Sequence, residues 1–326
     1  MLAGGLQLPV LLEAWTPAPV VAAVPADSGT INRTFVIETR AGHFFLRAYR
    51  PVERLHVERE HRLIAHARGR GLPVPAPIPT RRGGTILERE GRFYALFPPA
   101  AGRQVMRGQL TPALVHGAGT ALARVHRALR DYPPALVAPR SVTATNTDDR
   151  AATIAEIDRL ERVIRSRPEP DGSDRMLLGR LVERREWLRG STPPDLPDLS
   201  QVERQVVHGD YQDTNLFFHG DEVSAIIDWD QSYAAPRAWE VVRTLHLVWG
   251  FAPDPSRRFI EAYRAELALP LEELDVAGTC YGEMRAQDLW AYRTIYDDGD
   301  DRPRRFFRPG PFRPLSDGWA ALRSTL

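Results

Sequence analysis

The sequence predicts an α+β fold of two lobes, a small antiparallel β lobe with one helix and a larger, mainly helical lobe. Short runs rich in β-branched and aromatic residues dominate the first hundred residues, and helical patterns dominate after residue 110. Two consecutive prolines, Pro98 and Pro99, end the last early strand, because proline cannot donate to a strand ladder. We therefore expect one lobe over residues 1–98 and the other over residues 99–326.

The first lobe is predicted from strand-forming runs separated by turn residues. Strands are expected at residues 18–24, 34–38, 43–49, 85–88 and 93–97. Residues 39–42, which end in Gly42, form the turn between the second and third strands. Residues 51–68 combine apolar positions with many charges, which indicates an amphipathic helix that stops at Gly69 and Gly71.

The second lobe is predicted mainly from helical periodicity. The best-supported helix covers residues 111–129, where Thr111 fits the N-cap and Pro112 the first helical position. Short strands are expected between residues 206 and 227, and a long loop over residues 297–314. Further helices are expected at residues 151–165, 174–188, 237–249, 256–267, 271–295 and 315–322.

Composition excludes several classes of protein. The formal net charge is +1, which gives no argument for a nucleic-acid or membrane-surface partner. Cys280 is the single cysteine, so an internal disulfide framework and a multi-cysteine zinc site are excluded, and a reducing cytoplasm is the expected location. No apolar run approaches the roughly 18–20 residues that span a bilayer. The sequence contains no lysine, so all 43 basic residues are arginine.

The segment from His208 to Asp230 has the pattern expected of a catalytic centre. A short apolar strand runs into Asp210, and Asn215 follows five residues later. Two further strands with a turn at residues 219–221 then lead to Asp228. Because a hairpin returns the chain to its starting point, we expect Asp228 to lie beside Asp210 and Asn215.

Two carboxylates and an amide in this arrangement fit phosphoryl transfer. That reaction needs a carboxylate that accepts the proton of the attacking hydroxyl, and oxygen ligands that hold Mg²⁺ against the phosphates. Asp210 is the candidate base, and Asn215 and Asp228 are the candidate metal ligands. Turn and cap roles are the alternative for each residue taken alone, and a metal hydrolase site beginning at His208 is another.

The pattern HGDxxxxN followed by IIDWD resembles the aminoglycoside phosphotransferase and choline kinase superfamily, a branch of the protein-kinase-like fold, and its homoserine-kinase-like members. Residues 28–34 are similar to the family's nucleotide-covering loop, and residues 45–50 to the strand with the phosphate-anchoring basic residue. Residues 60–77 and 122–126 also resemble family segments. The resemblance runs from about residue 29 to about residue 242.

The resemblance implies roles for individual residues. Asp210 is then the catalytic base, with Asn215 and Asp228 on the metal and His208 bracing the loop. Asp230 is either a second metal contact or a helix cap, and both remain open. The residues that would contact the nucleotide, including a backbone N–H for its base, are Gly29, Asn32, Arg47, Glu60 and Ala100.

This chain departs from the common family pattern at two positions. Arg47 stands where most relatives carry lysine, and a guanidinium can replace the ammonium because it is always charged and can chelate two phosphate oxygens. Relatives that resemble homoserine kinases often carry arginine here. Glu240 replaces an aspartate, and we expect it to be structural, as we do His126. Trp290 and Tyr296 are expected in the core of their helix.

The function implied is phosphorylation of a small-molecule hydroxyl with ATP (or GTP) and Mg²⁺. The acceptor would be an amino alcohol, an amino acid such as homoserine, a sugar or an aminoglycoside-like compound. A stress-response-type protein kinase and a catalytically weak nucleotide-binding module are the alternatives. The acidic stretch at residues 297–301 is interpreted as a solvated loop, with a trap for a cationic acceptor as the second interpretation. Neither nucleic acid nor membrane is an expected partner, and the oligomeric state is left open.

Overall fold

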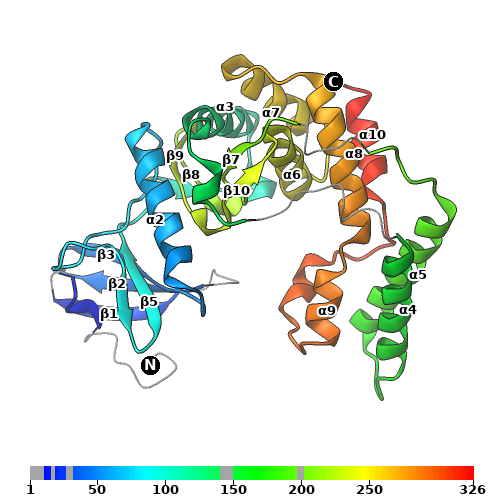
Figure 1. Ribbon diagram of the computed structural model, residues 1–326, viewed down its shortest axis with the longest axis horizontal. Helices are drawn as coiled ribbons and strands as arrows, with labels where there is room; N and C mark the ends of the chain where they lie inside the picture. Colours follow the sequence, from blue (N-terminus) through cyan, green and yellow to red (C-terminus); the bar gives the residue numbers. More distant parts are fainter. Residues whose placement is uncertain (1–10, 16–18, 27–31, 140–149, 197–201) are drawn as a thin grey trace. The chain divides into compact units, whose positions relative to one another are not determined.

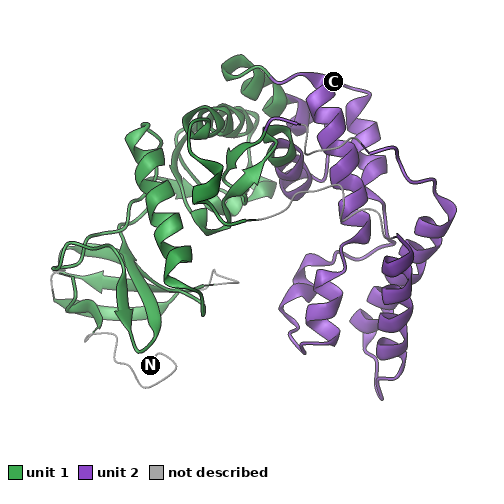
Figure 2. Cartoon of the chain, viewed as in Figure 1, with its two compact units in different colours: residues 1–140, 204–240, 258–268 green, residues 141–203, 241–257, 269–326 purple. Residues whose placement is uncertain are grey.

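The computed structural model describes residues 11–15, 19–26, 32–139, 150–196 and 202–326. The chain forms two compact units (Figure 2). Unit 1 contains residues 1–140, 204–240 and 258–268, and unit 2 contains residues 141–203, 241–257 and 269–326. The predicted catalytic segment thus groups with the N-terminal sheet, and the proposed lobe boundary at residue 98 stays a prediction.

Unit 1 begins with a five-stranded antiparallel sheet, seen in Figure 1 in blue to cyan. The predicted hairpin of the second and third strands is present, with Thr39 paired to Gly42 at its turn. In sheet order the strands are β1 (Val20–Pro25), β2 (Arg33–Thr39), β3 (Gly42–Ala48), β5 (Arg92–Phe97) and β4 (Leu87–Arg89).

The two faces of this sheet bury different sets of residues. On β5, Tyr94 and Leu96 pack into a core with Trp15, whereas Phe93 and Ala95 pack on the opposite face. That opposite face is covered by helix α2 (Arg54–Gly69), which contributes Val57 (Figure 1). Alternation along a strand produces this division, because successive side chains point to opposite faces.

The rest of unit 1 carries short strands around a helix. Helix α3 (Pro112–Leu129) begins as expected, since the Thr111 side chain accepts a hydrogen bond from the Leu114 N–H. Strand β8 lies between β6 and β9, and β7 pairs with β10. These elements are β6 (Arg103–Gln104), η1 (Arg107–Gln109), η2 (Pro134–Leu136), β7 (Gln205–Val207), η5 (Asp213–Asn215), β8 (Leu216–His219), β9 (Glu222–Ile226), η6 (Trp229–Gln231) and β10 (Tyr233–Ala235).

Unit 2 is helical over its described residues. Its helix α8 packs against α10, and α4 packs against both α5 and α9. Helix α6 begins in unit 1 and ends in unit 2, and helix α7 begins in unit 2 and ends in unit 1. The bounds are α4 (Arg150–Arg165), α5 (Gly172–Gly190), α6 (Arg237–Trp249), α7 (Pro253–Glu266), α8 (Leu271–Gln287), α9 (Trp290–Tyr296), η7 (Arg302–Phe306) and α10 (Leu315–Arg323).

Two expectations for unit 2 were wrong. The helix predicted over residues 271–295 is two helices, α8 and α9, separated at Asp288. The Asp288 carboxylate accepts the backbone N–H of Trp290, and Arg184 donates to the freed carbonyls of Arg285 and Asp288, so side chains replace the missing helical bonds. Trp290 is 45% exposed rather than core, because it is the first residue of the new helix.

No helix in the described ranges is both long and apolar enough to cross a membrane.

Candidate active site

An arginine on the sheet and a glutamate on helix α2 form the first part of the site. Arg47 lies on β3, and its Nη1 is 2.7 Å from Oε1 of Glu60. Arg47 points toward α2 because Leu46 and Ala48, its neighbours on β3, pack into the core on the other face of the sheet. Glu60 is only 4% exposed and occupies the buried stripe of α2. The pairing expected from the sequence is therefore present.

Tyr49 completes this ion pair, and sequence reasoning missed it. Its hydroxyl donates to Oε2 of Glu60 at 2.8 Å, so both carboxylate oxygens have a donor. The sequence contained the evidence for this contact, because Tyr49 follows Arg47 by two residues and alternate residues of an extended strand face the same side of the sheet. Burial raises the pKa of Glu60 to about 7, and the Arg47 guanidinium opposes that rise. Burial alone would lower the pKa of Arg47, but Glu60 and Asp228 raise it above its ordinary value.

The loop after β7 is held by a buried glutamate. Glu240 accepts the backbone N–H groups of His208 (3.0 Å) and Gly209 (2.5 Å), and it also accepts from Nε2 of His126 (2.9 Å). Burial would raise the pKa of Glu240, but the His126 hydrogen bond holds it below its ordinary value. Glu240 on α6 and His126 on α3 thus have a structural role, as expected, because they hold this loop in place.

Gly209 cannot carry a side chain at its position. Its φ is +85°, and an added Cβ would lie 2.1 Å from the carbonyl oxygen of Gln231. The close approach brings the loop at residues 208–210 against the segment that contains Asp228 and Asp230. Glycine is required here for both backbone conformation and space.

His208 joins the same two segments through its ring. The Asp210 N–H donates to Nδ1 (3.2 Å), and Nε2 donates to the carbonyl of Ile227, the residue before Asp228 (3.0 Å). One neutral imidazole therefore links the loop carrying Asp210 to the end of the hairpin. This is the bracing contact that the sequence led us to expect.

Two side-chain amides converge on one oxygen of Asp210. Nδ2 of Asn215 lies 2.9 Å, and Nε2 of Gln212 lies 3.0 Å, from Oδ2 of Asp210. Asn215 Nδ2 also donates to the Asp210 carbonyl at 2.7 Å. Gln212 was missed from the sequence, although it stands within the HGDYQDTN run. These amides fix the orientation of the carboxylate without adding a charge.

The hairpin of β8 and β9 carries Asp228 back to this loop. Leu216 pairs with Ile226, and the Ile227 N–H donates to the Asn215 carbonyl at 3.0 Å. Asp228 then adopts a left-handed backbone conformation (φ 68°, ψ 62°), a position that aspartate tolerates better than most residues. Its Oδ1 lies 3.1 Å from Nη2 of Arg47. The arginine thus spans Glu60 and Asp228 with its two terminal nitrogens.

Asp228 lies in an excess of negative charge. Burial raises the pKa of its carboxyl, Arg47 opposes this, and the charges of Asp230 and Asp210 add to the rise. Such a group of acids, with oxygen donors and a single nearby arginine, fits a hard divalent cation. In the described ranges no three His, Cys, Asp or Glu side chains are placed to hold a metal by themselves. A cation here would therefore take its remaining ligands from the Asn215 amide and from phosphate oxygens.

The remaining predicted residues are Asp230, Asn32, Ala100 and Gly29, and the structure brings the first two together. Asp230 is 7% exposed and accepts from Nδ2 of Asn32 at 3.0 Å. Helix η6 has no side-chain cap, so the capping interpretation of Asp230 finds no support. Ala100 follows β5 in an irregular segment, and its contact with the nucleotide base stays a prediction. Gly29 lies outside the described residues.

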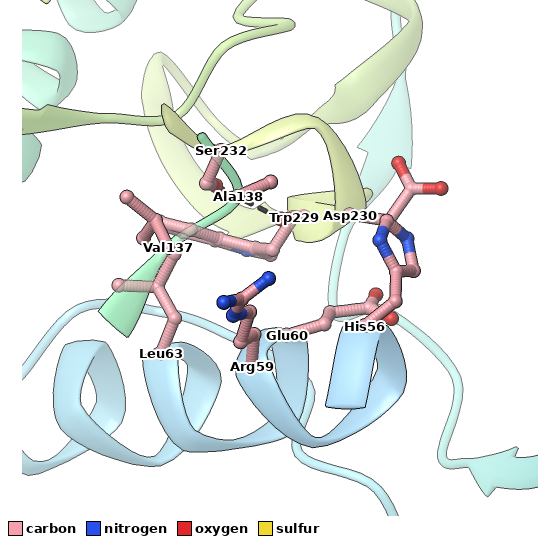
Figure 3. Close-up of a pocket in the computed structure, with 9 residues that line it drawn as sticks. All are labelled: His56, Arg59, Glu60, Leu63, Val137, Ala138, Trp229, Asp230 and Ser232. Atoms are coloured by element: carbon pink, nitrogen blue, oxygen red, sulfur yellow. Dashed lines mark hydrogen bonds between the residues drawn. The ribbon is translucent and has the colours of Figure 1, made fainter. Parts of the chain in front are cut away.

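A small pocket adjoins the site between α2 and the residues of η6 (Figure 3). Glu60 and Asp230 both line it, so it borders the ion pair and the second acid. Figure 3 shows the Arg59 guanidinium extending from α2 toward Trp229. The other lining residues are His56, Leu63, Val137, Ala138 and Ser232.

Comparison with known proteins identifies the family of this chain. A family model described as the phosphotransferase enzyme family matches residues 22–303. The chain belongs to this family. It is 29% identical over 272 residues to a homoserine kinase of Rhodopseudomonas palustris (strain BisB5), covering 81% of this chain and 76% of that one. It is 31% identical over 263 residues to a homoserine kinase of Bradyrhizobium sp. (strain BTAi1), covering 76% and 71%.

Solved structures of this family show the same fold at low identity. A spectinomycin phosphotransferase superposes with a TM-score of 0.68 at 15% identity, covering 99% of this chain and all of that one. An amicoumacin kinase superposes with a TM-score of 0.63 at 14% identity, covering 97% and 90%. The predicted protein-kinase-like α+β fold is therefore confirmed, and the chain is a kinase.

Proposed function

We propose that this phosphotransferase moves the γ-phosphoryl group of ATP to a hydroxyl group of a small molecule. The observation that carries the proposal is the convergence of Asp210, oriented by two amides, with Asp228, held by Arg47. In this proposal the first acid serves the acceptor hydroxyl, and the second serves a cation on the phosphates. Phosphoryl transfer depends on such positioning and charge neutralisation more than on covalent chemistry.

Each residue of the site then has one task. Asp210 accepts the proton of the acceptor hydroxyl, and Gln212 and Asn215 orient its carboxylate for this. Asn215 and Asp228 would hold Mg²⁺, which neutralises charge on the phosphate oxygens when bound. Arg47 contacts the phosphates and is oriented by Glu60, because a guanidinium can chelate two oxygens.

The nucleotide would lie along the N-terminal sheet. By the family resemblance, Gly29 and Asn32 belong to the loop that covers the phosphates. Ala100 supplies a backbone N–H to the base, because Pro98 and Pro99 have none. The solved amicoumacin kinase contains AMP-PNP and Ca²⁺, and the spectinomycin phosphotransferase contains ADP, which supports a nucleotide and a divalent cation here. We propose ATP and Mg²⁺, with GTP as the alternative nucleotide.

The acceptor class is inferred from the relatives. The curated relatives named above are homoserine kinases, and the solved neighbours carry the names of spectinomycin and amicoumacin. We propose an amino acid such as homoserine as the first acceptor to test. Amino alcohols, sugars and aminoglycoside-like compounds follow as a second group.

An ADP-release screen of these acceptors with ATP and Mg²⁺ tests the proposal. Asp210→Ala should lower kcat by roughly 10²–10⁴-fold, the range for loss of a general base, while ADP still shifts the melting temperature. Asp221→Ala is a matched control, because Asp221 is an exposed aspartate at the turn of the same hairpin. Equal turnover by wild type and Asp210→Ala would remove Asp210 from its role.

Two other outcomes would redirect the assignment. Transfer of labelled phosphate onto protein, with no small acceptor used, would favour a protein kinase. Nucleotide binding with no turnover on any acceptor would favour a nucleotide-binding module. Arg47 is the residue that keeps the second alternative open, because it replaces the family's lysine.

A further inference from the structure

Two side chains from the N-terminal sheet region contact the two acids of the DWD sequence. Arg47 binds Asp228, and Asn32 binds Asp230, across 181 and 198 residues of sequence. We propose that Asn32 is a positioning residue that fixes the Asp230 carboxylate beside Asp228, and that its side chain does not bind the nucleotide. The catalytic consequence of this inference rests on the proposed function, whereas the hydrogen bond between Asn32 and Asp230 does not.

Both ends of the Asn32 carboxamide are occupied. Its Nδ2 donates to Oδ2 of Asp230 at 3.0 Å, and its Oδ1 accepts the backbone N–H of Arg50 at 3.1 Å. A flipped amide would place oxygen against a carboxylate and nitrogen against an N–H, so only this orientation satisfies both partners. One N–H of Nδ2 and the Oδ1 acceptor are thus engaged within the protein, which favours a positioning role for this side chain over a phosphate contact.

The bridge starts at the open end of the β2–β3 hairpin. Asn32 directly precedes β2 and Arg50 lies two residues beyond β3, where Arg33 pairs with Ala48. The Asn32 to Arg50 hydrogen bond therefore closes the open end of the β2–β3 hairpin, the strand pair that also carries Arg47. Asn32 and Arg47 thus reach the 228–230 segment from one structural element.

Asp230 accepts hydrogen bonds from two neutral amide donors. Its Oδ1 accepts from Nε2 of Gln231 at 3.2 Å, and its Oδ2 from Asn32. Among the described residues it forms no ion pair with an arginine, although it is 7% exposed. A buried carboxylate with only amide donors keeps a strong negative field for its surroundings. His56, Arg59 and Glu60 are the titratable side chains that line the same pocket from α2.

The mechanistic consequence concerns how the site holds a cation. Asn32 keeps the Asp230 charge at a fixed distance from Asp228, so both acids act together on a metal–nucleotide complex. Without Asn32 the Asp230 side chain would keep the Gln231 contact but would be less restrained against rotation toward Arg59 or solvent. Of the two bridges formed by Asn32 and Arg47, only that of Arg47 would then remain.

A double-substitution cycle of Asn32→Asp and Asp230→Asn tests the bridge, with urea unfolding of the ligand-free chain as the readout. Asn32→Asp alone sets two carboxylates against each other and should raise the unfolding equilibrium constant roughly tenfold, about 1.4 kcal/mol. The double variant restores an amide–carboxylate pair in reverse and should return within about threefold of wild type. Simple additivity of the two single effects would overturn the proposal.

A binding measurement separates positioning from nucleotide contact. In Asn32→Ala we expect the Kd of ADP in EDTA to stay within about threefold, while Mg²⁺–ATP turnover falls roughly tenfold. Loss of ADP binding in EDTA would instead make Asn32 a direct contact and overturn the proposal. Gln109→Ala, which removes an exposed carboxamide from η1, is the control and should change neither quantity. If wild type shows no turnover, the proposed function fails, whereas the unfolding cycle still reports on the bridge.

Discussion

In unit 2 every described buried carboxylate lies against an arginine, whereas in the site of unit 1 a single arginine serves several acids. Glu283 pairs with Arg150 at 2.6 Å, and Asp174 and Glu161 likewise have arginine partners. In unit 1, Arg47 binds both Glu60 and Asp228, with Asp230 close by. The residue types are the same in the two units, but the balance of charge differs.

This difference separates structural from functional acids. Neutralised pairs, as in unit 2, make charged residues compatible with a packed interior. An excess of acids raises the free energy of the empty site, because like charges repel at short range in a medium of low dielectric constant. Such an arrangement is useful when a cation binds there, and this is the interpretation that we propose for Asp228 and Asp230.

The largest expected effect comes from Asp228→Asn. Removing this charge should lower kcat/KM by about 10³-fold, or about 4 kcal/mol of transition-state stabilisation, and should weaken the dependence on Mg²⁺. The unfolding free energy should stay the same or rise, because repulsion from Asp230 and Asp210 is relieved. Activity assays and urea unfolding on the same preparations test both parts. A large loss of stability would place Asp228 with the structural acids of unit 2.

The opposite result is expected from Glu283→Gln in unit 2. Arg150 and Glu283 form a two-bond pair at 2.6 and 2.7 Å, with side chains 11% and 3% exposed. Breaking a buried pair leaves an uncompensated charge, so unfolding should become easier by about 3 kcal/mol, while the ADP Kd stays unchanged. Urea unfolding and ADP titration are the measurements. A variant as stable as wild type would show that the pair contributes little.

A pH dependence should arise from His61 in unit 1. Burial, helped by the charge of Arg47, lowers the pKa of His61 from 6.5 to about 4, and the neutral ring bonds Tyr49 and Thr85. Between those values the unfolded chain takes up a proton that the folded chain does not. The contribution of neutral His61 to the free energy of unfolding is therefore fully present above about pH 6.5. It is lost as the pH drops toward 4, by up to about 3 kcal/mol.

The contribution of His61 is isolated by comparison with His61→Asn. Urea unfolding of both chains across pH 4–8 should show a smaller acid loss in the variant, since other groups titrate equally in both. Parallel pH profiles for the two chains would contradict the assignment to His61.

The smallest effect is expected at the acidic stretch of residues 297–301. There Asp297 contacts Arg159, Asp300 contacts Arg302, and Asp301 contacts Arg304, as in the rest of unit 2. Asp300→Asn should leave the unfolding midpoint unchanged, because exposed pairs contribute little. It should also leave the acceptor KM unchanged. A rise in KM for a cationic acceptor, with kcat preserved, would instead support the interpretation of this stretch as a substrate trap.

Local patterns predicted most elements because their causes are local. Runs of β-branched and aromatic residues predicted β2, β3 and β5, and the Thr111 cap with Pro112 predicted the start of α3. The break between α8 and α9 was not predictable in the same way. It depends on Arg184, about a hundred residues away in the sequence, which supplies donors to carbonyls that the helix leaves free.

The motif from His208 to Asp230 by itself indicated Asp210, Asn215 and Asp228 as neighbours, since their spacing on a strand, loop and hairpin leaves few ways to fold. The number of acids per arginine was decided only by the tertiary structure. Asn32 meets Asp230, and Arg47 meets both Glu60 and Asp228, because a sheet and a distant hairpin pack together. No local periodicity encodes such contacts, since each depends on how separate elements pack in space rather than on their spacing in the chain.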